Sequence, residues 1–203
     1  ILPALAIQSI SGELSLLSFY HLAPYFEKLV ISNAELTAER SQAGVISIAG
    51  IALDPNESGH AGSDWLLAQN AIQLSNAVIH WQDREKKKLD TDVRIESLLI
   101  SNGLRDHLID VVAYLPSNPS PLRLSADFKH GLGGEPGNWR NWNGQFTWDF
   151  KGLNLNRLAL DFRLPLPMLE GVLESRGFVI LNKGRLSGGV ALLFADVLRV
   201  QFK

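Results

Sequence analysis

Apolar side chains recur at every second residue along much of this 203-residue chain. In residues 158–164, leucine or phenylalanine occupies every second position, and Asp161 and Arg163 lie between them. Because successive side chains of a β-strand point to opposite faces, this pattern predicts a strand with one apolar and one polar face. Segments 122–128 and 146–150 repeat the alternation. The sequence therefore predicts a mainly β protein built from one-sided strands.

Short clusters of asparagine and glycine separate these alternating segments. Both residue types tolerate positive φ, so each cluster is expected to reverse the chain into an antiparallel neighbour. The phrase Ser-Asn-Ala occurs twice, at 32–34 and 75–77, which indicates a weak repeat of similar hairpins. The turns are expected at residues 33–34, 76–77, 102–103, 182–184 and 188–189.

Two segments depart from the two-residue period. Residues 12–26 space their apolar side chains at three- and four-residue intervals, which predicts a helix of two or three turns that ends before Pro24. Residues 62–71 offer Ser63 or Asp64 as the N-cap of a second short helix. The expected fold is a curled antiparallel β-sheet, an open groove in shape, with one or two short helices.

The composition excludes several classes of function. A formal charge of −2 and a pI near 6.2 provide no basic surface for nucleic acid. The chain has no cysteine, which excludes disulfides and thiolate metal sites. It begins at Ile1 and has no apolar run of the roughly 20 residues that span a bilayer. We therefore expect it to be one segment, residues 1–203, of a longer polypeptide.

No motif in the sequence predicts catalysis or a bound cofactor. The chain has neither a P-loop nor a GxSxG nucleophile motif. No HxH or HExxH spacing brings two imidazoles to one metal among the five histidines, which are His21, His60, His80, His107 and His130. The expectation is a non-enzymatic protein without metal or cofactor. Trp139 and Trp142 leave open a carbohydrate-binding module or glycosidase, although packing at a sheet edge is the commoner role of such residues.

Several segments resemble the periplasmic region of the YhdP family, the large AsmA-like proteins of the Gram-negative envelope. Residues 34–53 are similar to a strand pair of that family, and residues 65–72 (WLLAQNAI) and 80–84 (HWQDR) follow them. A W-x-x-W-x-G element at 139–144 completes the resemblance, which covers most of the chain. None of these motifs is catalytic, so the resemblance by itself assigns no site.

The resemblance implies a long, curved β-sheet with an apolar concave side. Proteins of this kind are similar to bridge-type lipid transfer proteins, which an N-terminal helix holds to the inner membrane. They cross the periplasm and supply phospholipid to the outer membrane. The chain is thus expected to be a periplasmic segment of an AsmA-like β-groove domain. Its partners would be phospholipid acyl chains, the membrane through the N-terminal helix of the full-length protein, and other envelope proteins.

Transfer of a chain of roughly 16 carbons into water costs more than ~10 kcal/mol at about 0.8 kcal/mol per methylene, so a carrier needs a continuous apolar lining. Alternation alone also fits a structural β-domain, with a closed core, that scaffolds envelope partners. The residues expected to line an open groove and contact lipid are Leu122, Leu124, Phe128, Phe146, Trp148, Phe150, Leu158, Leu160, Phe162 and Leu164.

Overall fold

The computed structural model of the chain describes residues 4–16, 18–19, 22, 24–52, 61–84, 89–116, 118–131, 138–157, 168–196 and 199–201. Helix α2 (Ala61–Ala68), a 3₁₀ turn η1 (Trp139–Asn141) and further helical residues at 18–19 and 155–157 accompany the strands. The strands are β1 (Leu5–Leu14), β2 (Phe26–Arg40), β3 (Ile46–Ile48), β4 (Ile51–Ala52), β5 (Ala71–Asp83), β6 (Leu89–Asn102), β7 (Asp106–Tyr114), β8 (Leu122–Lys129), β9 (Asn143–Asn154), β10 (Met168–Glu170), β11 (Val172–Asn182), β12 (Arg185–Ala195) and β13 (Arg199–Gln201).

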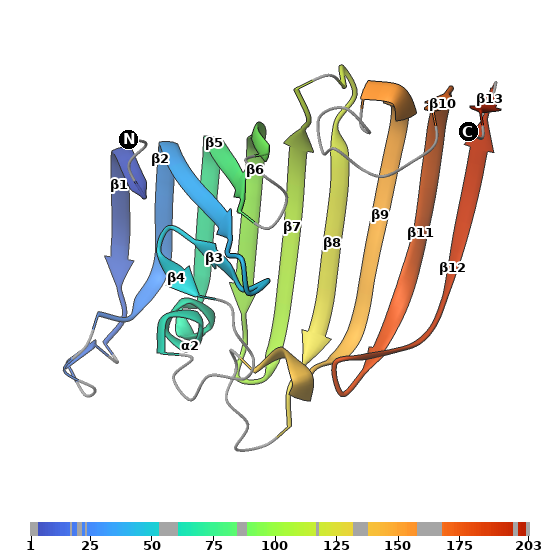
Figure 1. Cartoon of the computed structure of the whole chain (residues 1–203). Helices are drawn as coiled ribbons and strands as arrows, with labels where there is room; N and C mark the ends of the chain where they lie inside the picture. Colours follow the sequence, from blue (N-terminus) through green and yellow to red (C-terminus); the bar gives the residue numbers. More distant parts are fainter. Residues whose placement is uncertain are drawn as a thin grey trace.

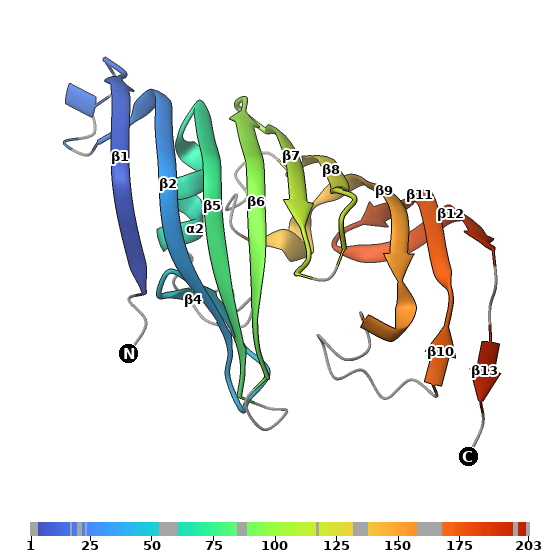
Figure 2. The ribbon, with the colours of Figure 1, turned by 90° about the horizontal axis from the view of Figure 1, so that it is seen from above.

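Eleven of these strands form one open sheet, with the order β12-β11-β9-β8-β7-β6-β5-β2-β3-β4 and with β1 also paired to β2 (Figure 1). From β5 to β12 each strand pairs antiparallel with the one before it in the sheet, which confirms the expected meander. Strands β10 and β13 form a separate two-stranded sheet. Seen from above, the large sheet curves from β1 to β12 and does not close on itself (Figure 2). The described residues therefore form an open curled sheet and not a sealed sandwich.

One pair of neighbours departs from the antiparallel rule. Strands β2 and β5 run parallel, and every paired residue in β5 lies 43 positions after its partner in β2, from Leu29 with Ile72 to Arg40 with Asp83. The segment between them contains the β3–β4 hairpin and helix α2, which supplies the long crossover that parallel neighbours need. The two Ser-Asn-Ala phrases thus lie side by side, and the hydroxyls of Ser32 and Ser75 are 2.9 Å apart.

Single extra residues interrupt the two-residue alternation of side chains within strands β2, β5 and β9. In β5, Leu74 and Ala77 are three positions apart, yet both are buried in the same cluster. Asn76 between them has a φ of 50°, and Asn33 at the matching place in β2 has a φ of 53°. A comparable step in β9 surrounds Gly152, with a φ of 65°. Irregular steps of this kind add twist and bend a strand, so they contribute to the curl while keeping apolar residues on one face.

The turn predictions are confirmed at two positions and wrong at three. The turns at 102–103 and 182–184 are confirmed: Asn102 ends β6, and Lys183 and Gly184 connect β11 to β12 with φ values of 49° and 66°. The turns expected at 33–34, 76–77 and 188–189 are wrong, because these pairs lie inside β2, β5 and β12. Asparagine and glycine serve there as positive-φ or small residues within a strand rather than as chain reversals.

The helix predictions are confirmed in part. Helix α2 forms where expected but begins at Ala61, so Ser63 and Asp64 lie in its first turn and neither is the N-cap. The helix expected over 12–26 is much shorter, because residues 12–14 belong to β1 and residue 26 begins β2. Ser18 and Phe19 are the helical residues that the structure describes between those strands.

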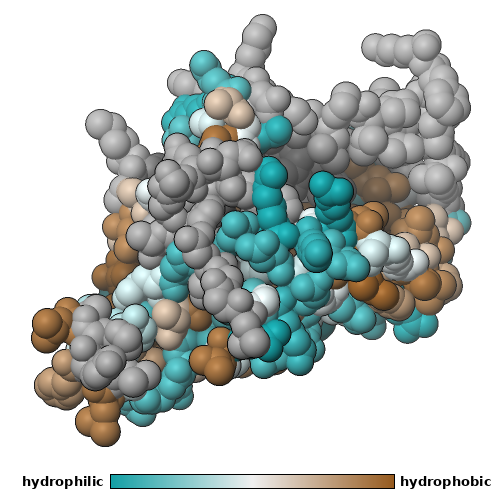
Figure 3. Space-filling model, turned by 90° about the horizontal axis from the view of Figure 1, so that it is seen from below, coloured by the Kyte–Doolittle hydropathy of each residue, from teal (hydrophilic) through white to brown (hydrophobic). Residues whose placement is uncertain are grey.

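Both ends of the sheet expose apolar side chains. Every residue of β12 is exposed, including Leu193 and Phe194, and nearly every residue of β1 is exposed too. Seen from below, hydrophobic colour gathers at the lower left, by the connection between β1 and β2, and at the right over β11 and β12 (Figure 3). Within the described residues, no strand pairs with the outer edge of β12. The sheet therefore has free hydrogen-bonding edges.

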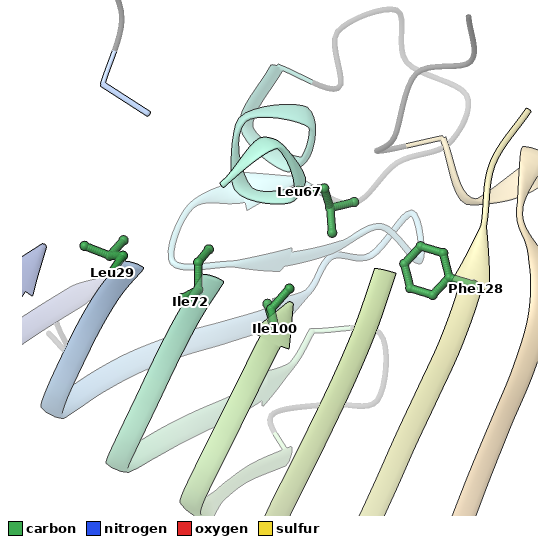
Figure 4. Packing of buried hydrophobic residues seen from close by; sticks show 5 residues of the cluster. All are labelled: Leu29, Leu67, Ile72, Ile100 and Phe128. Atoms are coloured by element: carbon green, nitrogen blue, oxygen red, sulfur yellow. The ribbon is translucent and has the colours of Figure 1, made fainter. Parts of the chain in front are cut away.

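Helix α2 covers one face of the sheet near β2, β5 and β6. Leu67 points from the helix toward the strands, and Leu29, Ile72 and Ile100 point back from three neighbouring strands (Figure 4). The four side chains are 4–7% exposed. Full burial of each contributes about 1.5–3 kcal/mol, so this cluster is the main anchor of the helix.

Candidate functional site

A continuous apolar face crosses the sheet on the side of α2. We define this apolar face by two rows of directly paired residues, which are neighbours across successive strands. The first row contains Leu29, Ile72, Ile100, Ile109, Ala126, Phe146 and Val179. The second row contains Ile31, Leu74, Leu98, Val111, Leu124 and Trp148. Seven strands spaced roughly 4.8 Å apart give the first row a length of about 29 Å.

The pairing brings together six of the ten residues expected to line a groove. Leu124 pairs with Trp148, Leu122 pairs with Phe150, and Ala126 pairs with Phe146, so these side chains share the apolar face. The residues Leu158, Leu160, Phe162 and Leu164 lie outside the described part of the chain. A role in binding lipid stays a prediction for all ten.

Exposure along the apolar face changes from one side to the other. Ile72 under α2 and Leu74 beside it in β5 are buried, whereas Leu124, Phe146 and Trp148 in β8 and β9 are half-buried. An uncovered apolar surface therefore begins where the helix ends. The sequence prediction found its β8 and β9 members but missed Ile109 and Val111 of β7, although these too alternate at every second position.

The indole ring of Trp148 packs against Gly177 of β11, where any larger residue would clash with it. A Cβ atom on Gly177 of β11 would lie 2.7 Å from Cζ2 of Trp148 and 2.3 Å from the carbonyl oxygen of Val190. The indole Nε1 donates a hydrogen bond of 2.8 Å to the hydroxyl of Ser175, which is buried. The large ring is thus fixed across β11 with its polar atom satisfied, and its apolar surface remains on the apolar face.

An aromatic stack closes one end of the apolar face. The ring of Phe128 lies 3.6 Å from that of Trp142 and 5.0 Å from that of His107, which stacks on His130 at 5.2 Å between centroids. Phe128 is only 3% exposed, so it acts here as a core residue. Trp142 packs in the same stack, as expected for the commoner of the two roles considered for it.

A buried hydrogen-bond network joins this stack to α2. The amide of Asn102 donates to the carbonyl of Gln69 at 2.6 Å, so its Oδ1 accepts a hydrogen bond of 2.8 Å from Nδ1 of His107. Nε2 of His107 then carries a lone pair without a partner and is fully buried. Burial lowers the pKa of His107 to about 4, and the neighbouring His130 adds to the decrease. The imidazole is therefore neutral at pH 7 and serves the structure.

The opposite face carries charged residues and an open groove of about 880 Å³. Arg123, Asp149 and Arg176 pair directly across β8, β9 and β11 on this face, and each lines the groove. Apolar surface makes up the larger part of the lining and includes Leu99, Val112, Phe178, Val190 and Leu192. Most of the groove lining comes from residues that alternate with those of the apolar face, so the groove opens away from α2, although Leu98, Val111, Leu124 and Trp148 of the apolar face also contribute to its lining. The molecule therefore presents one apolar face and one mixed, charged face.

Within the described residues, no cluster of three histidine or acidic side chains is arranged to bind a metal ion. His80 lies near carboxylates on the charged face, with its Nδ1 2.7 Å from Asp92 and its Nε2 3.8 Å from Glu35.

Among the residues that the structure describes, no helix is long and apolar enough to cross a bilayer.

The sequence of this chain was compared with known proteins and protein families. No curated protein matches the chain. The profile of the YhdP protein family matches residues 2–203, which is nearly the entire sequence. The match includes every strand of the curled sheet and both of its faces. On this evidence the chain belongs to the YhdP family.

Proposed function

We propose that this chain is a lipid-binding segment of an envelope protein, in which acyl chains lie against the apolar face. The observation that carries the proposal is the half-buried part of the first row beyond α2, from Ile109 in β7 to Val179 in β11, which is about 14 Å long across four strands of an open sheet. An acyl chain fills half of the ~30 Å hydrocarbon core of a bilayer, so this uncovered part of the row is about as long as one chain.

Chemistry also favours the apolar face over the charged face. Transfer of an acyl chain from a membrane to water costs about 0.8 kcal/mol of free energy per methylene, and apolar contacts with the protein must offset this cost. The half-buried Leu124, Phe146 and Trp148 offer such contacts side by side. Arg123, Asp149 and Arg176 would instead be desolvated by an acyl chain, which carries no group to pair with them.

The YhdP family is an envelope family and not a known enzyme family. Membership of this family supports the further proposal that the segment lies in the periplasm, in an inner-membrane-anchored protein, and moves phospholipid between the two membranes without catalysis. Its partners would be phospholipid and other envelope proteins. The alternative is a structural domain that scaffolds envelope partners and holds no lipid.

Mass spectrometry of solvent extracts tests the proposal on the purified protein. We expect co-purified phospholipid in the wild type and at least about a tenfold loss in Leu124→Glu, because a carboxylate on the apolar face must be desolvated by the acyl chain. Ser125→Glu is the matched control, since Ser125 follows Leu124 in β8 and its side chain therefore points to the charged face. Far-UV circular dichroism verifies that both variants are folded.

The two variants also separate the alternatives. Loss of lipid in Ser125→Glu alone would move the binding site to the charged groove. A wild type without bound lipid, which also fails to take up a fluorescent phospholipid from vesicles, would favour the scaffold role.

A further inference from the structure

The connection between β1 and β2 exposes a group of large apolar side chains. Leu14, Leu16, Phe19 and Leu22 are 60%, 84%, 78% and 93% exposed, and we call these four residues the tip. The tip lies in the connection between β1 and β2, on the side of the sheet away from β8 and β9 (Figure 1). Contiguous exposed apolar surface of this kind marks a contact with another molecule or with a membrane.

Hydrogen bonds join the two ends of the segment that carries the tip, and we call the residues that make them its base. The amide of Ser15 donates to the carbonyl of Tyr25 at 2.8 Å, and the hydroxyl of Ser18 donates to the same carbonyl at 2.8 Å. The amide of Tyr25 donates back to the Ser18 hydroxyl at 3.0 Å. Since these polar groups are satisfied within the base, the tip can enter an apolar medium without leaving them unpaired.

The segment that contains the tip has no acidic or basic residue other than histidine. From Leu14 to Phe26 the sequence has no aspartate, glutamate, lysine or arginine. Glu13 and Glu27 flank this segment, and hydrogen bonds from Ser15 and Asn70 lower the pKa of Glu27, so its carboxylate stays ionised at neutral pH. The projection is therefore apolar at its end and charged at its base, as in segments that insert shallowly at a membrane surface.

The size of the tip argues against a stable protein partner. A standard protein interface buries about 800 Å² on each side, usually with a polar rim around an apolar centre. The four side chains of the tip supply only part of that area. A bilayer needs no matching surface, because each inserted side chain contributes separately.

From these observations we propose that the tip inserts into the surface of a lipid bilayer. Leu16, Phe19 and Leu22 enter the headgroup and upper acyl region, while the Ser15–Tyr25 base stays at the water interface. This contact is separate from the apolar face and places one end of the sheet against a membrane. It does not depend on lipid binding along β8 and β9.

Flotation with phosphatidylcholine vesicles tests the inference. We expect the wild-type chain to float with the vesicles to the same extent at 50 and 500 mM salt, because the tip offers no charge to be screened. Phe19→Glu and Leu22→Glu should each weaken partitioning by at least about tenfold. Leu104→Glu is the matched control, since Leu104 is 90% exposed in the separate turn between β6 and β7 and should leave flotation unchanged.

Other results would overturn the insertion. Equal loss of flotation in Leu104→Glu would assign binding to the general surface, and a need for anionic lipid at low salt would make it electrostatic. A wild type that does not float but dimerises in sedimentation, with the dimer lost in Phe19→Glu, would make the tip an interface between two copies. Lipid in solvent extracts is an independent readout: tip variants should keep it, and Leu124→Glu should keep flotation.

Discussion

Asn33 and Asn76 lie side by side in the parallel strands β2 and β5, and the side-chain amide of Asn76 donates a hydrogen bond to the side-chain carbonyl of Asn33. Both residues have positive φ, which few residues other than glycine and asparagine adopt without strain. After each of them an alanine, Ala34 or Ala77, is almost completely buried. The positive φ of each asparagine thus directs the following alanine to the apolar face, at matching positions of the two strands.

Replacement of Asn76 should separate the backbone contribution from that of the hydrogen bond. Asn76→Gly keeps positive φ and loses only the side-chain bond, so we expect the free energy of unfolding to fall by about 0.5–1.5 kcal/mol. Asn76→Val adds a β-branched side chain at positive φ and should cost about 1–3 kcal/mol more. Urea unfolding measures both values. Equal stability of the two variants would show that the conformation is not strained.

Gly177→Ala should disturb Trp148 specifically. The added methyl group meets the indole and the Val190 carbonyl, so we expect a loss of about 1–3 kcal/mol in stability and a shift in tryptophan fluorescence. Gly188→Ala in β12 is the matched control, because a Cβ atom there meets nothing within 4 Å. A similar small effect from both substitutions would contradict the close packing of Trp148 on β11.

Leu67→Ala should loosen α2 from the sheet. Leu67 is 7% exposed and packs against Leu29, Ile72 and Ile100, so truncation should cost about 2–5 kcal/mol. Hydrogen exchange should then accelerate in the α2 amides more than in β8 and β9. Leu66→Ala, at a partly buried neighbouring position, should have a smaller effect. Uniform acceleration across the sheet would mean that the helix does not unfold separately.

Acid should destabilise the protein through His107. Its folded pKa of about 4 lies below the ordinary value of 6.5, so the unfolded chain binds a proton that the folded chain does not. This contribution to stability is complete above pH 6.5 and declines as the pH falls toward 4, by at most about 1.4 kcal/mol per pH unit. Urea unfolding between pH 7.5 and 5.0 should reveal the slope, which His107→Phe should flatten. An NMR titration of His107 with a midpoint above pH 6 would contradict this assignment.

The sequence predicted the class of fold because β8 and β9 alternate without interruption where they meet. Leu122, Leu124 and Phe128 in one strand, and Phe146, Trp148 and Phe150 in the other, follow the two-residue period, so their common face could be read directly. The same reading fails at Leu74 and Ala77, because an extra residue between them changes the parity of the strand.

The parallel pairing of β2 and β5 could not be read from local signals either. Asn33 and Asn76 have the residue type of a turn, and only the pairing of strands 43 residues apart makes them strand residues. The repeated Ser-Asn-Ala phrase carried this information, since its two copies lie in matching positions of neighbouring strands. The repeat therefore marks a pair of parallel strands, and its interpretation as a repeat of similar hairpins was wrong.

The free edges of this sheet have a consequence for how such a protein changes in length. A closed barrel links strand number to diameter and tilt, so adding a hairpin alters the whole cross-section. A sheet with unpaired outer strands has no such condition, and a hairpin appended beside β12 would leave the pairing from β2 to β11 intact. Variation in strand number during evolution is thus compatible with an unchanged arrangement of the strands already present.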